Sequence, residues 1–352
     1  MSYEAKGEKS AVITPKERVV YQIHHRETEP LPYCLDFEGD IAERLDLYYG
    51  SAHWRSLLDN AIRKVPRPRV GVDPTSGEFY TDWYGSTWRV DCRPRKLIRP
   101  VLEKPSLAGY DFPDVDARLD AAWKNEALRA ISGQREHFLT LGFNAGLFER
   151  TWQLRGFTEA LMDAAANPEF YDDLLGRVAE HQLAIIDRLV EMPVDAIMFN
   201  DDWGYQKGVL LGPERWRRLL KPRLARQYDR VHRAGKYVVA HCCGNITDIV
   251  PDLIEIGLDV LESVQPEAMN PYELKKHYGT RLTFWGGLGS QSTIPFGSVD
   301  EIRGEVARLC REMGRGGGYI LAPAKELQPG TPVENAAVVV EAFLQQSQVQ
   351  FP

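Results

Sequence analysis

The sequence has 352 residues, of which 43% are hydrophobic, and a formal net charge of −7 at pH 7. That length allows either two average domains or one barrel with an added segment, and the apolar content is sufficient for a large core. The negative charge and the absence of any block of lysines or arginines exclude the usual pattern of a nucleic-acid-binding protein.

The five cysteines are odd in number and are not spaced like those of a secreted disulfide scaffold. We therefore expect reduced thiols and a cytoplasmic location. The N-terminal residues are polar and lack the apolar stretch of a signal peptide. No apolar run is long enough to span a bilayer, so no membrane partner is expected. A homodimer is compatible with this composition.

The first element in chain order is a helix that follows an expected disordered segment, residues 1–13. Thr14 is followed by Pro15, and Glu17 lies three residues after it. A threonine cap with proline at the first helical position is typical of a helix start, so we predict a helix to about His25.

The chain from residue 30 to about residue 130 is rich in Pro, Trp and Tyr and shows little long periodicity. Its predicted β-segments are two single strands and a hairpin that turns at Tyr84-Gly85-Ser86, namely 31–37, 69–72 and 79–90. We interpret residues 14–130, including these first strands, as an N-terminal elaboration folded onto the main domain.

From about residue 131 to residue 347, short apolar runs alternate with longer helical patterns. The predicted strands are 137–143, 195–200, 237–240, 259–264, 282–285 and 319–321. The predicted helices are 152–165, 168–191, 213–234, 246–256, 271–277, 299–313 and 332–346. Such alternation implies a parallel sheet with crossover helices. Six strands and two N-terminal candidates make eight, which predicts an α/β fold: a single (β/α)8 TIM barrel over residues 14–347 with an N-terminal elaboration.

The strand predicted at 237–240 runs directly into His241, Cys242 and Cys243. Residues i and i+2 of a strand point to the same side, so the imidazole of His241 and the thiol of Cys243 can converge. Both are preferred ligands of Zn²⁺, and barrel enzymes keep their chemistry at the C-terminal ends of strands. The alternative is a buried thiol beside a hydrogen-bonded histidine. Cys242 points the other way and is expected in packing.

Polar and ionisable residues recur where the other predicted strands end. Asp201 and Asp202 could act as a general acid or base, a metal ligand or a substrate anchor, or could form an Asx turn. The remaining candidates are Asp36, Glu149, Arg150, Gln265, Gly286, Gly287, Lys325 and Glu326. The two glycines would let a ligand lie against bare backbone, and Arg150 could receive an anionic substrate. Helix capping and solvated loops are the alternative for each.

Together these motifs resemble the uroporphyrinogen decarboxylase superfamily, a group of (β/α)8 barrels that includes zinc-dependent, corrinoid-linked methyltransferases. The resemblance covers nearly the whole chain, from Thr14 to Asn335. Its most specific parts are Asp201-Asp202-Trp203-Gly204, Ala234-Gly235-Lys236, His241-Cys242-Cys243-Gly244-Asn245, Trp285-Gly286-Gly287 and Gly316-Gly317-Gly318-Tyr319.

The segment after the first strand distinguishes the branches of this superfamily. True uroporphyrinogen decarboxylases carry an Arg-Gln-Ala-Gly-Arg segment there, whose arginines hold substrate carboxylates. This chain instead has Tyr33-Cys34-Leu35-Asp36-Phe37-Glu38-Gly39-Asp40, which contains no arginine. An acidic segment would repel a polycarboxylated porphyrinogen, so the resemblance favours the methyltransferase branch.

The methyltransferase branch holds zinc with a His-x-Cys pair, matched here by His241 and Cys243, and with a distant cysteine near the last strand. The position of that cysteine falls near Lys325, and a protonated lysine cannot ligate a metal. We predict Glu326 as the third ligand, with Asp202, Glu149 or water as alternatives. If no metal binds, Lys325 would instead anchor a substrate carboxylate.

The resemblance implies zinc-assisted methyl transfer, either O-demethylation or thiol methylation, on a small-molecule substrate. Cobalamin would arrive on a separate corrinoid protein, because no Asp-x-His-x-x-Gly motif occurs here. The predicted catalytic residues are Asp202, Asp201, Glu149 and Lys325. The predicted substrate-binding residues are Asp36, Arg150, Gln265, Gly286 and Gly287. Two alternatives stay open: a metal-independent decarboxylase or lyase of a small aromatic acid, and a binding subunit that has kept the barrel but lost its ligands.

Overall fold

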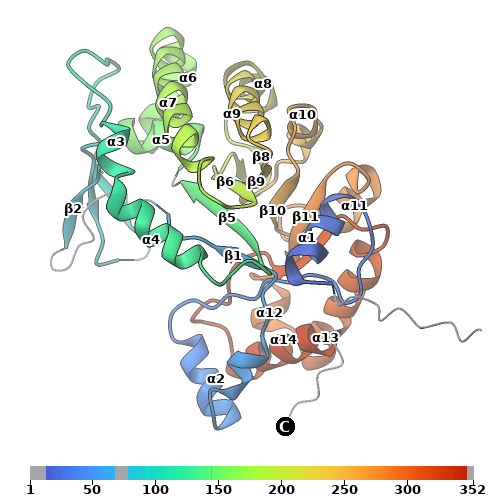
Figure 1. Ribbon diagram of the computed structural model, residues 1–352. Coiled ribbons are helices and arrows are strands. Elements are labelled where there is room, and N and C mark those ends of the chain that lie inside the picture. Colours follow the sequence, from blue (N-terminus) through green and yellow to red (C-terminus); the bar gives the residue numbers. More distant parts are fainter. Residues whose placement is uncertain (1–12, 68–77, 93, 144, 347–352) are drawn as a thin grey trace, which may run out of the picture.

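The computed structural model describes residues 13–67, 78–92, 94–143 and 145–346. Its centre is a curled parallel sheet with helices on its outer side (Figure 1). Seven strands follow one another around this sheet in chain order: β1 (Ile62–Lys64), β5 (Phe138–Phe143), β6 (Ala196–Asn200), β9 (Tyr237–His241), β10 (Val260–Val264), β11 (Thr283–Leu288) and β12 (Tyr319–Pro323). All six strands predicted from residue 131 onward are therefore confirmed.

Helices connect these strands, as a parallel sheet requires. They are α5 (Leu147–Arg155), α6 (Phe157–Ala166), α7 (Pro168–Leu189), α8 (Pro213–Leu219), α9 (Lys221–Arg233), α10 (Val250–Glu255), α11 (Pro271–Tyr278), α12 (Thr293–Phe296) and α13 (Val299–Arg308). A last helix, α14 (Val333–Gln345), follows β12. Gly156 separates α5 from α6 with a φ of 99°, a break that the apolar pattern did not indicate. Within the described part of the chain, no helix has the length and apolar character needed to cross a membrane.

The N-terminal half matches its prediction only in part. Helix α1 (Pro15–Ile23) begins with the predicted cap, because Thr14 and Glu17 form a reciprocal capping box. The predicted hairpin is present as β2 (Phe79–Thr81) and β3 (Thr87–Arg89), and β4 (Lys96–Arg99) adds a third antiparallel strand. The additional helices, which sequence analysis did not predict, are α2 (Ile41–Tyr49), α3 (Val115–Arg118) and α4 (Ala121–Ile131).

Two expectations for this half need separate comment. The strand predicted at 69–72 and nearly all of the segment expected to be disordered, 1–13, lie outside the described residues. The first strand of the parallel sheet is instead β1, which sequence analysis missed. Three residues are too few to show a period of two, which is the signal used to predict strands.

The segment predicted as a strand at 31–37 hydrogen-bonds to both edges of the sheet. The Cys34 N–H donates to the Leu321 carbonyl of β12 at 2.9 Å, and the Ala61 N–H donates to the Tyr33 carbonyl at 2.8 Å, next to β1. Isolated parallel bridges pair Tyr33 with Leu321 and Phe37 with Leu327. The segment thus lies between β12 and β1 without forming a continuous strand.

Apolar side chains fill the inside of the curled sheet. They come from α1 and from the strands and include Val19, Ile23, Phe138, Met198, Val239, Val260, Trp285 and Ile320. Helix α1 covers the N-terminal ends of the strands, where the Lys16 N–H donates to the Glu136 carbonyl at 2.8 Å and Lys16 Nζ lies 2.6 Å from Asp195. Because the interior is packed and one end is covered, a site for chemistry is expected at the C-terminal ends.

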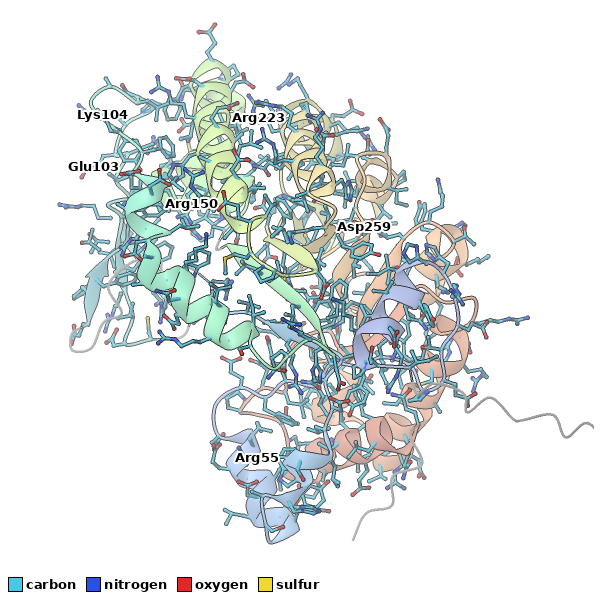
Figure 2. All side chains as sticks on the ribbon, viewed as in Figure 1. Arg55, Glu103, Lys104, Arg150, Arg223 and Asp259 are labelled. Atoms are coloured by element: carbon cyan, nitrogen blue, oxygen red, sulfur yellow. The ribbon has the colours of Figure 1, made fainter. Side chains whose placement is uncertain are left out.

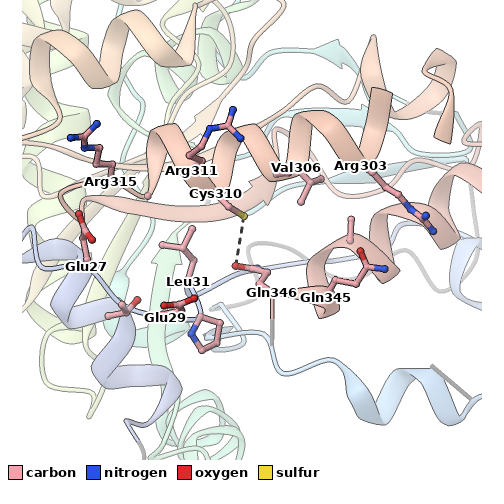
Figure 3. Close-up of a pocket in the computed structure, with 15 residues that line it drawn as sticks. Glu27, Glu29, Leu31, Arg303, Val306, Cys310, Arg311, Arg315, Gln345 and Gln346 are labelled. Atoms are coloured by element: carbon pink, nitrogen blue, oxygen red, sulfur yellow. Dashed lines mark hydrogen bonds between the residues drawn. The ribbon is translucent and has the colours of Figure 1, made fainter. Parts of the chain in front are cut away.

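A cavity of about 740 Å³ lies away from those C-terminal ends (Figure 3). Its lining includes Leu31, which precedes the segment between β12 and β1, and Arg315, which precedes β12. Cys310 and Arg311 line it from the short helical turn η3 (Leu309–Met313), which follows α13. The Cys310 thiol hydrogen-bonds to Gln346 Oε1 at 3.7 Å. This position corresponds to the face of a barrel that serves stability more than catalysis.

An aromatic cluster holds the elaboration against α7. His181 lies on α7, and the centroid of its imidazole ring is 5.4 Å from that of Trp83, 5.5 Å from that of Tyr84 and 5.2 Å from that of Phe112. His181 Nε2 is buried and has no hydrogen-bond partner among the described residues. The imidazole therefore packs as a neutral ring.

We predict that this histidine makes folding stability sensitive to acid. Burial, followed by the charge of Arg150, lowers the pKa of His181 to about 4 from an ordinary value of 6.5. The unfolded chain then binds more protons than the folded one, so the stability contribution is complete above pH 6.5 and is lost as the pH falls towards 4, by at most about 3 kcal/mol. Urea unfolding at about pH 7 and about pH 5 measures this loss. If His181→Phe loses as much unfolding free energy between these two pH values as the unaltered protein does, His181 is not the source of the acid sensitivity.

Candidate functional site

Three side chains with metal-ligand atoms meet at the C-terminal ends of β6 and β9. Asp202 follows β6, His241 is the last residue of β9, and Cys243 lies two residues further on. Their ligand atoms all lie within 4.8 Å of one another. His241 Nε2 is 3.5 Å from Cys243 Sγ and 3.8 Å from Asp202 Oδ1. The structure brings the predicted pair together and adds Asp202 to it; we call these three residues the metal-ligand cluster.

Strand register and one glycine bring Asp202 to this position. In the parallel pairing of β6 with β9, Asn200 lies opposite His241. The Cys243 backbone N–H then donates to Asp202 Oδ1 at 2.8 Å. A Cβ atom on Gly204 would lie 2.6 Å from the Cys243 carbonyl oxygen, so only glycine allows the two strand ends to approach this closely.

Glu262 orients the imidazole of the cluster. It lies opposite His241 in the register of β10 with β9, and its carboxylate hydrogen-bonds to His241 Nδ1. Burial lowers the pKa of His241, but the charge of Glu262 and the hydrogen bonds to Cys243 and Glu262 outweigh it and raise that pKa well above its usual range. Carboxylates commonly orient metal-ligating histidines in this way. Glu262 was not among the residues predicted for the site, although its place opposite His241 in the parallel register of two adjacent strands could have indicated a role.

Asp201 points away from the cluster and caps helix α5. Its carboxylate accepts hydrogen bonds from the backbone N–H groups of Phe148 at 3.0 Å and Glu149 at 2.8 Å, and from the Trp203 indole at 2.6 Å. Burial raises the pKa of Asp201 to about 7, and these N–H donors act in the opposite direction. Asp201 was predicted to be catalytic. In the structure this carboxylate is buried and both of its oxygens already accept hydrogen bonds, so the role that its contacts show is the positioning of α5.

A cleft of about 350 Å³ opens beside Asp202 and His241. Glu149 and Arg150, in α5, line it, as their predicted strand-end position requires. Burial, followed by the charges of Asp201 and Asp202, raises the pKa of Glu149 to about 8. The elaboration supplies further lining residues that sequence analysis missed: Arg67, Tyr80, Asp82, Trp88 and Arg95. No local pattern in the sequence indicates that these segments fold over the strand ends.

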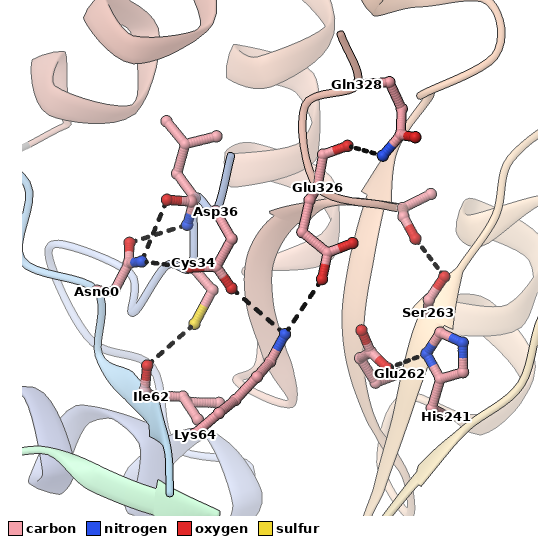
Figure 4. A network of polar contacts seen from close by, with 12 residues as sticks. Cys34, Asp36, Asn60, Ile62, Lys64, His241, Glu262, Ser263, Glu326 and Gln328 are labelled. Atoms are coloured by element: carbon pink, nitrogen blue, oxygen red, sulfur yellow. Dashed lines mark hydrogen bonds and ion pairs between the residues drawn. The ribbon is translucent and has the colours of Figure 1, made fainter. Parts of the chain in front are cut away.

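A lysine links several acidic residues next to the metal-ligand cluster (Figure 4). Lys64 Nζ lies 3.3 Å from Asp36 Oδ2 and 3.5 Å from Glu326 Oε1. Burial lowers the pKa of Lys64, but the charges of Glu262, Asp36 and Glu326 together raise it. Glu326, the predicted third ligand, is thus paired with Lys64 and lies outside the cluster of possible metal ligands found among the described residues. Asp202, which was an alternative third ligand, lies in that cluster instead.

Asp36 and Lys325 also differ from their predicted roles. Asp36 Oδ1 accepts a hydrogen bond from Asn60 Nδ2 at 3.0 Å, so its carboxylate is held by Asn60 and Lys64. Lys325 is exposed and is not among the described residues that line the cleft. Lys64, on β1, is a further cation near the metal-ligand cluster, and the sequence did not predict it because β1 itself was not predicted.

Three predicted substrate-binding residues instead shape the backbone around the site. Gln265 is buried, and its Oε1 accepts from the Gly244 N–H at 3.3 Å. Gly286 and Gly287 have φ values of 124° and 96°. A Cβ atom on Gly286 would lie 2.8 Å from the Val264 nitrogen, so the space beside it is filled by protein and not open to a ligand.

Cys242 has the packing role expected from the strand pleat. Its side chain is fully buried, and its sulfur accepts a hydrogen bond from the Trp203 N–H at 3.2 Å. Arg155, at the C-terminal end of α5, is also structural, because its guanidinium pairs with Asp163 at 2.9 Å. The ionisable side chains that line the cleft therefore come from the metal-ligand cluster, from α5 and from the N-terminal elaboration.

Ionisable and metal-ligating side chains at the C-terminal edge of a parallel β/α sheet define an enzyme of the TIM-barrel-like class. The chain belongs to the uroporphyrinogen decarboxylase (URO-D) family, whose model matches residues 93–345. This membership confirms the resemblance identified from the sequence motifs.

Two kinds of curated relative were found. The chain is 30% identical over 174 residues to "Methylcobamide:CoM methyltransferase MtaA" of Methanosarcina barkeri (strain Fusaro / DSM 804), an alignment that covers 49% of this chain and 48% of that protein. It is 22% identical over 279 residues to the uroporphyrinogen decarboxylase of Coxiella burnetii (strain RSA 493 / Nine Mile phase I), covering 72% of each. The chain thus spans about half the length of the methyltransferase that it matches. Both relatives are enzymes, in agreement with the expectation of an enzyme.

A solved structure agrees with the architecture. The methyltransferase from Methanosarcina mazei has a TM-score of 0.71 and 22% sequence identity to this chain. The match covers 95% of this chain and 99% of that one. At this identity the likeness establishes the fold: a parallel α/β architecture that extends over almost the whole chain.

Proposed function

We propose that this protein is a zinc-assisted methyltransferase that exchanges a methyl group between a small molecule and a separate corrinoid protein. The observation that carries the proposal is the metal-ligand cluster of Asp202, His241 and Cys243. It lies beside a cleft at the strand ends, in a chain related to a methylcobamide:CoM methyltransferase.

The residues of the cluster fit Zn²⁺ well. A carboxylate oxygen, an imidazole nitrogen and a thiolate sulfur are all zinc ligands, and their atoms lie close enough together to share one ion. Three protein ligands would leave a fourth position for substrate, which is the pattern of catalytic zinc sites. The carboxylate of Glu262 on the other ring nitrogen of His241 is the expected outer partner of a ligating histidine.

The chain's own residues hold and orient the reactants. When bound, zinc would lower the pKa of a thiol or polarise an ether oxygen. Glu262 keeps Nε2 of His241 facing Cys243 and Asp202. Asp201 holds the first turn of α5, which presents Glu149 to the cleft. Glu149 is then placed to give or take a proton at the reacting oxygen or sulfur.

The proposal extends to organisation and location. Segment 31–37, which bonds to both β12 and β1, would serve as the eighth strand of a closed (β/α)8 barrel within a single domain over 14–347. The corrinoid would be carried by the partner protein. All five cysteines are free thiols, which is consistent with a cytoplasmic location.

A second candidate is a metal-independent decarboxylase of a small aromatic acid. It is favoured by the relationship to uroporphyrinogen decarboxylase and by Arg150 in the cleft wall. Its other predicted anchor, Lys325, is exposed. The two candidates differ in whether CO₂ is released and whether a corrinoid is needed.

Methyl-transfer assays test the proposal. The zinc-loaded protein is incubated with methylcobalamin and a small thiol, and separately with cob(I)alamin and a methoxylated benzoate, while corrinoid absorbance is followed. We expect transfer in at least one direction, reduced at least about a hundredfold in Cys243→Ala, because removing a catalytic ligand disables the site. Cys310→Ala, a matched change far from the cleft, should retain full activity. If the methoxylated benzoate releases CO₂ and no corrinoid reacts, the decarboxylase, our second candidate, replaces this proposal.

A further inference from the structure

We infer that the cavity of about 740 Å³ between α13 and α14 binds an amphipathic organic anion with an aliphatic body. We call it the α13–α14 cavity. Its occupant stabilises the seam of the sheet, where segment 31–37 joins β12 and β1. The inference concerns a second site and does not depend on methyl transfer. It is carried by the apolar floor of the cavity, by its arginines and by one buried amide donor.

The α13–α14 cavity is separate from the cleft at the strand ends. Figure 2 shows Arg150, which lines that cleft, well apart from α13 and α14. The described residues that line the cavity and those that line the cleft do not overlap. The cavity volume falls within the roughly 300–1,000 Å³ typical of small-molecule sites. Part of its wall is η3, a π-helical turn, and such turns occur frequently at functional sites.

The floor of the cavity is aliphatic. Leu31 is 7% exposed, Val306 is 3% exposed and Ala342 is 8% exposed, so the protein itself covers most of their surface. No aromatic side chain occurs among the described residues that line the cavity. A ligand with methylene groups gains from burial against such a floor, whereas an aromatic ring finds no ring to stack on.

Three guanidinium groups add positive charge to this lining. Arg311 and Arg315 lie at one end of the cavity, and Arg303 lies at the other (Figure 3). Arg303 pairs with Glu341 at 2.7 Å, and Arg311 lies 3.3 Å from Glu312. Arg315 has no carboxylate within pairing distance among the described residues, so its guanidinium can receive an anion. Planar guanidinium groups match carboxylates in shape as well as in charge.

Two carboxylates of the lining offset only part of this charge. Glu27 Oε1 accepts a hydrogen bond from the Gly316 N–H at 2.6 Å, so Glu27 holds the glycine-rich turn that precedes β12. Glu29 is the other acidic residue of the described lining. Three arginines against two glutamates leave the cavity with an excess of positive charge, which favours an anion over a cation.

One hydrogen-bond donor in the wall lacks an acceptor. Gln346 lines the cavity, and its Nε2 is buried and has no hydrogen-bond partner among the described residues. Buried polar groups nearly always have a partner in native proteins, so an acceptor atom of a ligand is expected here. A carboxylate offers acceptor oxygens to this N–H group and to a guanidinium. An alkylammonium ion offers an acceptor to neither.

The walls of the α13–α14 cavity lead into both sides of the seam. Residues 27–31 line the cavity and continue directly into segment 31–37, while Arg315 precedes β12. The two sides meet where the Cys34 N–H donates to the Leu321 carbonyl at 2.9 Å. A ligand that contacts both walls binds the joined seam better than a separated one, and it therefore stabilises the joined form.

Calorimetric titration of the full chain with octanoate, octylamine and octanol tests the ligand class. We expect octanoate to bind at least about tenfold more tightly than the other two, because only its head group is an anionic acceptor. Arg311→Gln/Arg315→Gln should weaken octanoate binding by about tenfold and leave octanol binding unchanged. All four substituted arginines of this test and its control are exposed, so both variants should fold. The matched control is Arg215→Gln/Arg218→Gln on α8, outside the cavity, which should bind octanoate as the unaltered chain does.

Hydrogen exchange with and without saturating octanoate tests the effect on the seam. We expect the amides of segment 31–37 and of β12 to exchange at least about fivefold more slowly when octanoate is bound, because the seam opens less often. The Arg311/Arg315 double variant should show no such slowing at the same octanoate concentration, whereas the α8 control should show it in full.

Each outcome decides the inference. Equal affinity for octanoate and octylamine would overturn it, as would equal weakening of octanoate binding by the two double variants. Octanoate binding that leaves exchange in segment 31–37 unchanged would overturn the stabilisation of the seam. Neither measurement uses methyl transfer, so a protein without transferase activity that still binds octanoate through Arg311 and Arg315 would support this inference and contradict only the proposed function.

Discussion

His241→Ala is expected to remove stoichiometric zinc from the purified protein and to abolish methyl transfer. His241 is the central member of the metal-ligand cluster, with Nε2 3.5 Å from Cys243 Sγ and 3.8 Å from Asp202 Oδ1. Two remaining side chains, one of them a carboxylate, hold zinc far more weakly than three do. Elemental analysis after dialysis, with circular dichroism to verify folding, measures the effect.

Graded variants of the same site sharpen this expectation. Cys243→Ala and Asp202→Ala should also lower zinc content, whereas Glu262→Gln should keep the ligands and weaken zinc affinity by about 10- to 100-fold, as loss of an outer partner does. Cys310→Ala removes a thiol outside the cluster and should retain zinc. If His241→Ala binds zinc as tightly as the unaltered chain, the metal-ligand cluster is not the zinc site.

Asp201→Ala is expected to lower the free energy of unfolding by about 3–5 kcal/mol, because three N–H donors lose their partner in a buried setting. These donors belong to Phe148, Glu149 and Trp203, and Asp201 itself is only 1% exposed. The first turn of α5 would lose its cap, and with it the orientation of Glu149. Urea unfolding followed by circular dichroism measures the change.

Two controls separate this structural role from a catalytic one. Asp201→Asn keeps one acceptor oxygen and should cost less stability than alanine. Asp202→Ala, at the adjacent carboxylate, should cost much less stability while removing activity, because Asp202 is half-buried and belongs to the metal-ligand cluster. An Asp201→Ala protein as stable as the unaltered chain would show that α5 needs no cap from this residue.

The repeat part of the fold could be predicted because its signals are local. Strands such as 195–200 and 259–264 are short apolar runs between helical patterns, and the start of α1 shows its capping box within four residues. The elaboration gave weaker signals. β1 and β4 are only three and four residues long, and α2 and α4 lie in a stretch without long periodicity. Arg67 and Arg95 were missed for the same reason: only folding brings them over the strand ends.

The sequence by itself determined the β/α alternation, and it predicted the pair of His241 and Cys243 from the rule that side chains two residues apart in an extended chain point to the same side. The two side chains do lie together, although β9 ends at His241 and Cys243 follows the strand. The tertiary structure decided what completes that pair. The register of β6 with β9 brings Asp202 to the cluster, and that of β9 with β10 brings Glu262 to His241. Lys64, on β1, pairs with Glu326 and keeps it outside the cluster. These contacts join residues on different strands, so their distances depend on how the sheet curls and not on spacing along the chain.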